Sequence, residues 1–382
     1  MKRIIFWAVL LSPAFVVLFF IFAFISDGLQ LNKIDHDGIK ISLERYLQTK
    51  EPTTFPPPEA LSAADAAHAN VYVFGESSVV LTDKLTFSHY LEKNLNEAGP
   101  DAKVTNFGIP GIDSYSIKKR VSQALQFAPA KPKVLLLYYG HNDYNVAYDN
   151  IINIVYDGSF NIFLKIGNYI SGGKFNFPEQ KFVFNSEKFG ELYWYARFRR
   201  PVFLNLAQKA GLFKVDNVRY DGYNEMILAH FKKNTEEILL MAREAGIPVI
   251  LVTPIGNLHA KPYGAIEIVD KNYKQGLSAK DYKESHNLLM KARDNEVFTG
   301  DIRAKTPLND YLRSLHNGTN VFVFDLEKDF TEEKFAFDES NFMDYFHFND
   351  KAHQKIAGYL AGKIMSDPKL SRSLAPDKRP AR

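Results

Sequence analysis

An aspartate and a histidine lie three residues apart near the end of this 382-residue sequence, as Asp344 and His347 in the motif DYFH. An imidazole can act as a general base when a carboxylate binds one ring nitrogen, fixes its tautomer and leaves the other nitrogen free. Such a base can remove the proton of a serine hydroxyl, which is otherwise a weak nucleophile. One turn of chain can bring the two side chains together, although aspartates and histidines are also common helix caps.

A serine suited to that base ends the stretch VYVFGESS, residues 71–78. The β-branched and aromatic run predicts a buried strand, and Gly75 permits a sharp turn after it. Ser77 should therefore lie at the C-terminal end of the strand, where a doubly wound α/β sheet carries its chemistry. Taken alone, the stretch also fits a plain turn with Ser77 or Ser78 as a helix cap, and Ser78 is the alternative nucleophile.

The elements that must position these residues alternate along the chain. Strands are expected at residues 71–75, 102–107 and 133–139, separated by helices at 86–98 and 114–128. This order predicts right-handed crossovers and a parallel sheet. Three strand ends, at Ser77, Gly111 and Asn142, should then meet at one edge. The alternation resumes later with helices and strands expected at 222–246, 247–254, 279–297, 307–315 and 320–326, and with a last helix from Asn349 or Asp350.

The composition excludes several classes of protein. With 46% hydrophobic residues the chain can bury a large core. A net charge of +3, with no long basic stripe before the C-terminal tail, argues against a dedicated nucleic-acid binder. The absence of cysteine excludes disulfides, thiolate metal sites and a cysteine nucleophile.

The N-terminus predicts a membrane anchor. Residues 4–25 carry no charge and follow Lys2 and Arg3, and the run is long enough to cross a bilayer. No small residues mark a cleavage site, so residues 1–29 should form an uncleaved single-pass anchor in the inner membrane, with the remainder in the periplasm. Residues 30–69 should form a stalk that contains one short amphipathic helix and a proline-rich spacer.

The folded domain is expected over residues 70–366, with one interruption. Residues 145–221 are rich in aromatic residues and lack a regular alternation of strands and helices, which predicts an insertion over the active edge. It could simply pack on the core, or it could form a lid or a surface for lipid or glycan. The tail, residues 367–382, is basic and contains proline, so we expect disorder there.

Four motifs together resemble the SGNH (GDSL-like) hydrolase superfamily: GESS at 75–78, NFGIPG at 106–111, GHND at 140–143 and DYFH at 344–347. The resemblance implies a three-layer, doubly wound parallel sheet of flavodoxin-like order. It implies Ser77 as nucleophile, with Asp344 and His347 completing a triad. The oxyanion hole would comprise the backbone N–H groups of Ser77 and Gly111 and the amide of Asn142. No cofactor or metal is implied.

Three residues near these motifs need separate interpretation. Glu76 replaces the aspartate usual in the first block of the family, a change that should preserve activity. His141 occupies a position that varies in the family, where a structural or surface role is favoured over substrate contact. His353, six residues after His347, could suggest a metal site with Asp350, but the spacing favours a packing or surface residue.

The function expected from these patterns is a serine-dependent ester hydrolase or acyltransferase that acts on an O-acylated, acetylated envelope glycan. A lysophospholipase or lipid esterase is the alternative enzyme, favoured if the insertion forms an apolar groove that faces the bilayer. A binding or assembly protein that keeps the fold without activity is a third hypothesis. No nucleic-acid partner is expected, and the substrate itself rests on analogy because one fold serves many substrates.

Overall fold

The computed structural model describes residues 36–49, 69–82, 84–127, 132–148, 211, 221–262, 267–296 and 303–375. Its centre is a sheet of five parallel strands in the order β2-β1-β3-β4-β5. The strands are β1 (Ala69–Gly75), β2 (Ala102–Asn106), β3 (Val134–Tyr138), β4 (Val249–Val252) and β5 (Val321–Phe324). All five were predicted from the sequence, and this is the order of a flavodoxin-like doubly wound fold.

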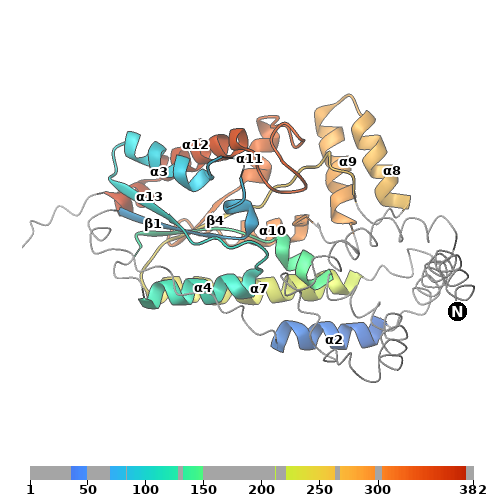
Figure 1. The fold of residues 1–382 in the computed structure, drawn as a ribbon, viewed down its shortest axis with the longest axis horizontal. Helices are drawn as coiled ribbons and strands as arrows, with labels where there is room; N and C mark the ends of the chain where they lie inside the picture. The colour runs from blue at the N-terminus through green and yellow to red at the C-terminus, as the bar shows by residue number, and fades with distance from the viewer. Residues whose placement is uncertain are drawn as a thin grey trace, which may run out of the picture.

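Helices cover both faces of the sheet and make three layers (Figure 1). One face carries α3 (Phe87–Glu97), α11 (Leu326–Glu332), α12 (Asp350–Ser366) and α13 (Pro368–Leu374). The other face carries α2 (His36–Thr49), α4 (Ser114–Phe127), α7 (Asp221–Glu244) and α10 (Thr306–Ser314). A pair of helices, α8 (Glu267–Ser278) and α9 (Tyr282–Asp294), projects beyond one end of the sheet (Figure 1).

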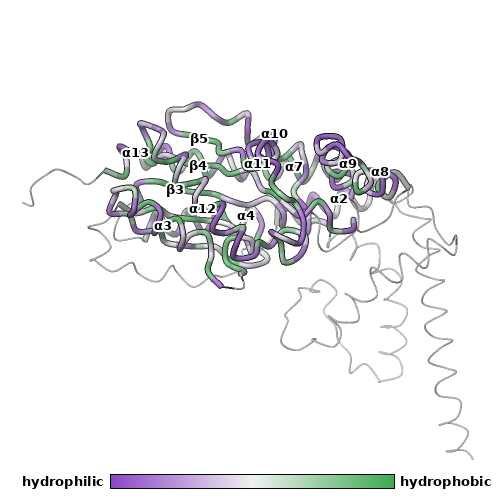
Figure 2. Tube along the Cα trace, turned by 90° about the horizontal axis from the view of Figure 1, so that it is seen from above, coloured by the Kyte–Doolittle hydropathy of each residue, from purple (hydrophilic) through white to green (hydrophobic). Residues whose placement is uncertain are grey.

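Alternation along the strands builds a separate core on each face. In β1, Tyr72 and Phe74 pack toward α4 and α7, whereas Val71 and Val73 pack toward α3 and α12. Successive side chains of a strand point to opposite faces, so a strand covered on both sides must be apolar throughout. Figure 2 shows this as hydrophobic stretches along the strands, with hydrophilic residues on the outer helices and connections.

Two predictions at the chain's periphery need revision. The helix predicted in the stalk is present as α2, but Leu43 and Leu47 are buried against the core, so this part is no free spacer. The tail was expected to be disordered from Asp367, which is wrong for α13. Asp367 caps this helix through the backbone N–H groups of Lys369 and Leu370. Leu370 and Leu374, one turn apart, are fully buried.

Other predicted segments lie outside the described residues. These are the membrane anchor, the proline-rich spacer, most of the 145–221 insertion and the last seven residues of the tail. Residues 145–148, at the start of the predicted insertion, continue the helix that begins at His141. In the described parts of the chain, no helix is long and apolar enough to span a bilayer.

Candidate active site

Asp344 and His347 form a hydrogen-bonded pair, as their spacing predicted. The carboxylate Oδ2 lies 2.5 Å from His347 Nδ1, and Oδ1 accepts the backbone N–H groups of Phe346 and His347. Burial would raise the pKa of the Asp344 carboxyl, but the hydrogen bonds from His347 and Phe346 outweigh it and hold the pKa below the usual value. The carboxylate therefore stays charged and fixes the proton on Nδ1.

The other nitrogen of His347 is left as an acceptor. Nε2 is buried and has no hydrogen-bond partner within the described part of the chain, so Ser77 Oγ is not yet bonded to it. Catalytic hydrogen bonds are often long in the absence of substrate and tighten when it binds. The structure thus brings the predicted acid and base together and leaves the contact between base and nucleophile unmade.

Ser77 begins a short 3₁₀ helix, η2 (Ser77–Val79), directly after β1. Its residue exposure is 6%, whereas neighbouring Ser78 is fully buried and its Oγ has no partner in the described structure. Both serines are buried, and Ser77 is the one of the two that keeps some contact with solvent. Gly75 allows the end of β1 to lie close against β3, since a Cβ there would lie 2.4 Å from the Tyr138 carbonyl oxygen.

The other two predicted oxyanion donors, Gly111 and Asn142, follow β2 and β3. Gly111 has φ = +76°, a conformation that glycine adopts without strain, and a Cβ there would meet nothing within 4 Å. Asn142 lies in the first turn of the helix over residues 141–148, and its side-chain Nδ2 donates to the Ile112 carbonyl at 3.1 Å. That bond ties the Asn142 amide to the turn that contains Gly111.

The carboxylate of Glu76 holds this helix start in place. Oε1 accepts the His141 backbone N–H and Oε2 accepts that of Asn142, both at 2.8 Å. The first N–H groups of a helix have no partner within it, so a buried carboxylate is a suitable cap. Burial raises the pKa of Glu76 to about 8, against the lowering effect of these two hydrogen bonds.

The sequence indicated Glu76 only as a variant next to the nucleophile and missed this capping role. The available signal was an acidic residue at the end of a buried strand, which requires a partner. Asp143 makes a further contact between segments at this edge of the sheet. Its oxygens accept the Ser114 hydroxyl at 2.5 Å and the Ser114 N–H at 3.1 Å. Asp143 thereby joins the start of α4 to the same helix.

His141 and His353 are both structural in their contacts, as the sequence favoured. His141 is fully buried, and burial lowers its pKa to about 3, so the ring is neutral. Its Nδ1 accepts the Ala304 N–H at 2.9 Å. His353 is also fully buried, and its Nδ1 accepts the Phe87 N–H at 3.1 Å, which fixes the start of α3 against α12. Among the described residues, no cluster of His, Asp or Glu could hold a metal.

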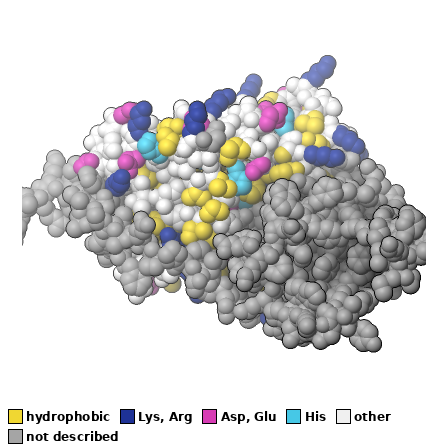
Figure 3. Space-filling view, viewed as in Figure 1, with side chains coloured by type: hydrophobic (Ala, Val, Ile, Leu, Met, Phe, Trp, Pro, Cys, Tyr) yellow, Lys and Arg dark blue, Asp and Glu magenta, His cyan; other side chains and the backbone are white. Residues whose placement is uncertain are grey.

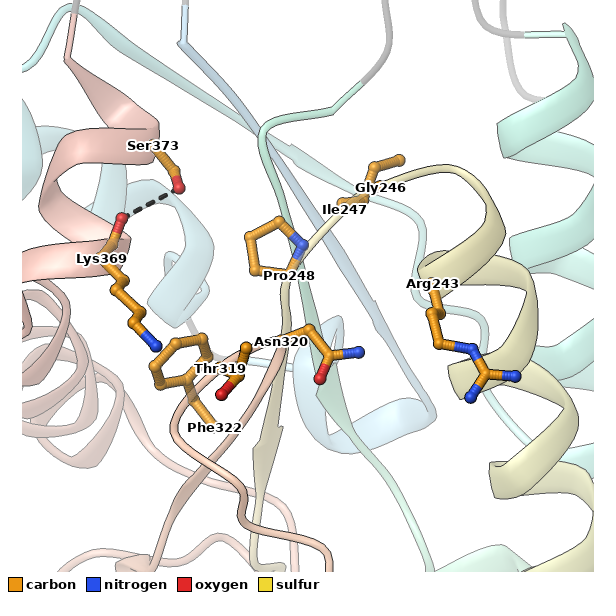
Figure 4. Close-up of a pocket in the computed structure, with 9 residues that line it drawn as sticks. All are labelled: Arg243, Gly246, Ile247, Pro248, Thr319, Asn320, Phe322, Lys369 and Ser373. Atoms are coloured by element: carbon orange, nitrogen blue, oxygen red, sulfur yellow. Dashed lines mark hydrogen bonds between the residues drawn. The ribbon is translucent and has the colours of Figure 1, made fainter.

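A cavity of about 300 Å³ lies at the opposite edge of the sheet (Figure 4). It is formed before β4 and β5 by Ile247, Pro248, Thr319 and Asn320, with Arg243 and Lys369 at its sides. In doubly wound sheets, ligands bind outside the carboxyl ends of the strands. This cavity is at the amino ends and shares no residue with the site around Ser77.

Comparison with known proteins gave matches among solved structures alone, since no family model and no curated protein matches the chain. A lipase from a goat rumen metagenome is 13% identical, with a TM-score of 0.38, over 79% of this chain and 99% of the lipase. A lipolytic protein of the G-D-S-L family from Desulfitobacterium hafniense is 11% identical, with a TM-score of 0.37, over 77% of this chain and 98% of that one. An acetyl xylan esterase is 14% identical, with a TM-score of 0.36, over 77% of this chain and 99% of the esterase.

Among these neighbours, the protein from Desulfitobacterium hafniense is named for the G-D-S-L family, which the four motifs resemble. The low identities and TM-scores of the neighbours decide nothing about the activity by themselves. The sheet order 2-1-3-4-5 is that of a flavodoxin-like doubly wound fold, and the four motifs lie at its carboxyl edge. Activity must be argued from the side chains at that edge.

Proposed function

We propose that the protein is a serine-dependent ester hydrolase or acyltransferase, with Ser77 as nucleophile, His347 as base and Asp344 as the residue that orients the base. The observation that carries this proposal is the Asp344–His347 hydrogen bond of 2.5 Å, with His347 Nε2 left free of described partners. A surface histidine serving only as a cap would not need its ring fixed by a carboxylate.

The proposed reaction has two steps. Ser77 Oγ attacks the acyl carbon while its proton passes to His347 Nε2, and the carbonyl becomes an oxyanion. The Ser77 and Gly111 N–H groups and the Asn142 amide stabilise that oxyanion. The ester C–O bond then breaks, and the His347 proton goes to the leaving alcohol. Water or an acceptor hydroxyl attacks the acyl-enzyme by the same route in reverse, which releases an acid or a new ester.

For the substrate we propose an O-acylated, acetylated glycan of the cell envelope, with the catalytic domain held outside the cytoplasm by residues 1–29. The uncharged run after Lys2 and Arg3 supports the location. On the described part of the face in Figure 3, Lys and Arg side chains are interspersed with those of Asp and Glu.

A lipid ester is the second candidate, and a specific observation favours it. Leu81, four residues after the nucleophile, is 43% exposed, and Met343, next to Asp344, is 45% exposed. Apolar side chains exposed this close to a reactive serine could receive an acyl chain. The neighbours named as a lipase and as an acetyl xylan esterase do not separate the two candidates.

Hydrolysis of a series of p-nitrophenyl esters by the full-length chain tests both points. Turnover should be abolished in Ser77→Ala, by a factor on the order of 10⁴, with an unchanged circular dichroism spectrum. Comparable rates for the variant and the parent would refute the nucleophile. A preference for acetyl would support the glycan, and a preference for octanoyl or longer chains would move the lipid ester ahead.

A further inference from the structure

Residues 303–304 contact two segments beside the proposed site, namely the helix that begins at His141 and the connection after β4. The backbone N–H of Ala304 donates to His141 Nδ1, next to Asn142, at 2.9 Å. The guanidinium of Arg303 donates through Nη1 to the carbonyl oxygen of Asn257, in the connection after β4. These two contacts lead by different routes to the loop that carries Asp344 and His347.

The first route passes through Asn257. Its backbone N–H donates to the Tyr345 carbonyl at 2.8 Å, and its side-chain Nδ2 donates to the Asp344 carbonyl at 3.1 Å. Its Oδ1 accepts the N–H groups of His259 and Ala260, which fixes the Asn257 side chain in a turn. The backbone on which the Asp344 carboxylate stands is therefore bonded directly to Asn257.

The second route passes through the ring of His141. This ring stacks on Phe346, with centroids 4.7 Å apart and an interplanar angle of 13°. Phe346 immediately precedes His347, and their rings lie 4.6 Å apart. A displacement of Ala304 would therefore move the His141 ring and, with it, the packing behind the proposed base.

A buried ion pair gives Arg303 a single orientation. Glu296 and Arg303 have side-chain exposures of 0% and 1%. The carboxylate binds Arg303 at two points, with Oε1 accepting Nη2 and Oε2 accepting Nε at 3.2 Å. Gly256 leaves room for this arrangement, because a Cβ there would lie 2.9 Å from the Tyr345 carbonyl oxygen and 3.1 Å from Arg303 Cδ.

We propose that Arg303, oriented by Glu296, is a positioning residue that sets the Asp344–His347 loop against the strand end of Asn142. A contribution to stability does not explain why this ion pair is buried here, because replacing a buried ion pair by apolar side chains is often neutral or stabilising. Positioning of the Asp344–His347 loop is a better explanation, since a misplacement of about 1 Å in a catalytic group can cost roughly 100-fold in rate. This inference rests on the function proposed above.

The test compares two variants with a matched control in the full-length chain. The double variant Glu296→Leu with Arg303→Met removes both charges, since removing one alone would leave the other buried without a partner. Asn257→Asp keeps the acceptor for His259 and Ala260 but loses the donor to Asp344. The control is Arg293→Met with Glu327→Leu, another buried Arg–Glu pair, whose hydrogen bonds run to Asp294, Thr306 and Arg313.

Three quantities are measured: the rate at which a fluorophosphonate labels Ser77, the melting temperature, and the downfield proton resonance of His347 Nδ1. We expect labelling to slow about 10-fold to 100-fold in the double variant and in Asn257→Asp. The His347 resonance should shift or broaden in both, and the control should keep the parent's rate and resonance. A melting temperature within a few degrees of the parent's shows that the fold is intact.

Parental labelling and an unchanged resonance in the folded variants would overturn the positioning role. Equal slowing in the control would overturn it too, since any buried pair would then have the same effect. If the double variant does not fold, the labelling rate and the His347 resonance of Asn257→Asp decide whether the positioning role holds. If the parent itself is not labelled, the proposed function fails, and the resonance still decides whether Arg303 and Asn257 hold the Asp344–His347 pair.

Discussion

Replacing Glu76 by glutamine should weaken the fold at the point where the site is assembled. The carboxylate is fully buried and accepts one backbone N–H on each oxygen, from His141 and from Asn142. Glutamine has one accepting oxygen, and its NH₂ group would face the second N–H. A buried donor without an acceptor costs about 1–3 kcal/mol, and two such donors arise here. Near pH 5 Glu76 is protonated, but its hydroxyl oxygen can still accept the second N–H, which an NH₂ group cannot do. We therefore expect the free energy of unfolding to fall by about 2–6 kcal/mol near pH 5.

The pH dependence distinguishes this effect from ordinary destabilisation. The pKa of Glu76 is raised from 4.5 to about 8, so the folded protein keeps a proton that the unfolded chain has released over this range. The contribution of Glu76 to the free energy of unfolding is therefore fully present below about pH 4.5 and is lost as the pH rises through about 8. At about 1.4 kcal/mol per pKa unit, the loss is on the order of 5 kcal/mol. Glu76→Gln lacks this term, so its deficit should shrink as the pH rises.

Urea unfolding followed by far-UV circular dichroism, at several values between about pH 5 and pH 9, measures both effects. Glu92→Gln is the matched control, because Glu92 Oε2 also accepts a backbone N–H, from Val104 at 2.8 Å, but is reached by solvent. It should lose no more than about 1 kcal/mol and keep the parent's decline with pH. A Glu76→Gln variant with the parent's stability and the parent's pH slope would refute the reasoning.

Three further substitutions test the site and its support. Asn142→Ala should lower kcat by roughly 10² to 10³ with little change in KM, and an unchanged kcat would remove Asn142 from the oxyanion hole. Asp344→Asn should lower kcat by up to roughly 10⁴ at an unaltered melting temperature, because the His347 tautomer is no longer fixed; activity near the parent's would exclude that role. Gly75→Ala should abolish soluble expression, since its Cβ would lie 2.4 Å from the Tyr138 carbonyl oxygen, and a folded, active variant would contradict this close packing of β1 against β3.

The strands could be predicted because their signal is local. Each is a short apolar run between helical segments, and such a pattern depends on nothing outside the run. The regions of Ser77, Gly111 and Asn142 could be placed together for the same reason, since parallel strands must end at one edge. The start of α12 near Asn349 or Asp350 was also foreseen from the residues after DYFH, whereas the capping role of Asn349 was not.

The unforeseen features depend on partners far away in the sequence. Glu76 caps a helix 65 residues later, and Arg303 reaches Asn257 across 46 residues. The hydrophobic periodicity of the sequence reports local secondary structure and does not predict such contacts. The helix α13 was missed for a different reason: the basic, proline-containing composition of the tail hid Leu370 and Leu374, which bury one face of a seven-residue helix. The helices α8 and α11 were not predicted either.

Labelling with a fluorophosphonate, read by intact mass, tests the central claim most directly. The reagent reacts only with a serine whose proton a neighbouring base can remove. We expect a single adduct on the full-length parent and on the control Ser78→Ala, and none on Ser77→Ala. A folded parent without an adduct, or an adduct that persists in Ser77→Ala, would contradict that claim.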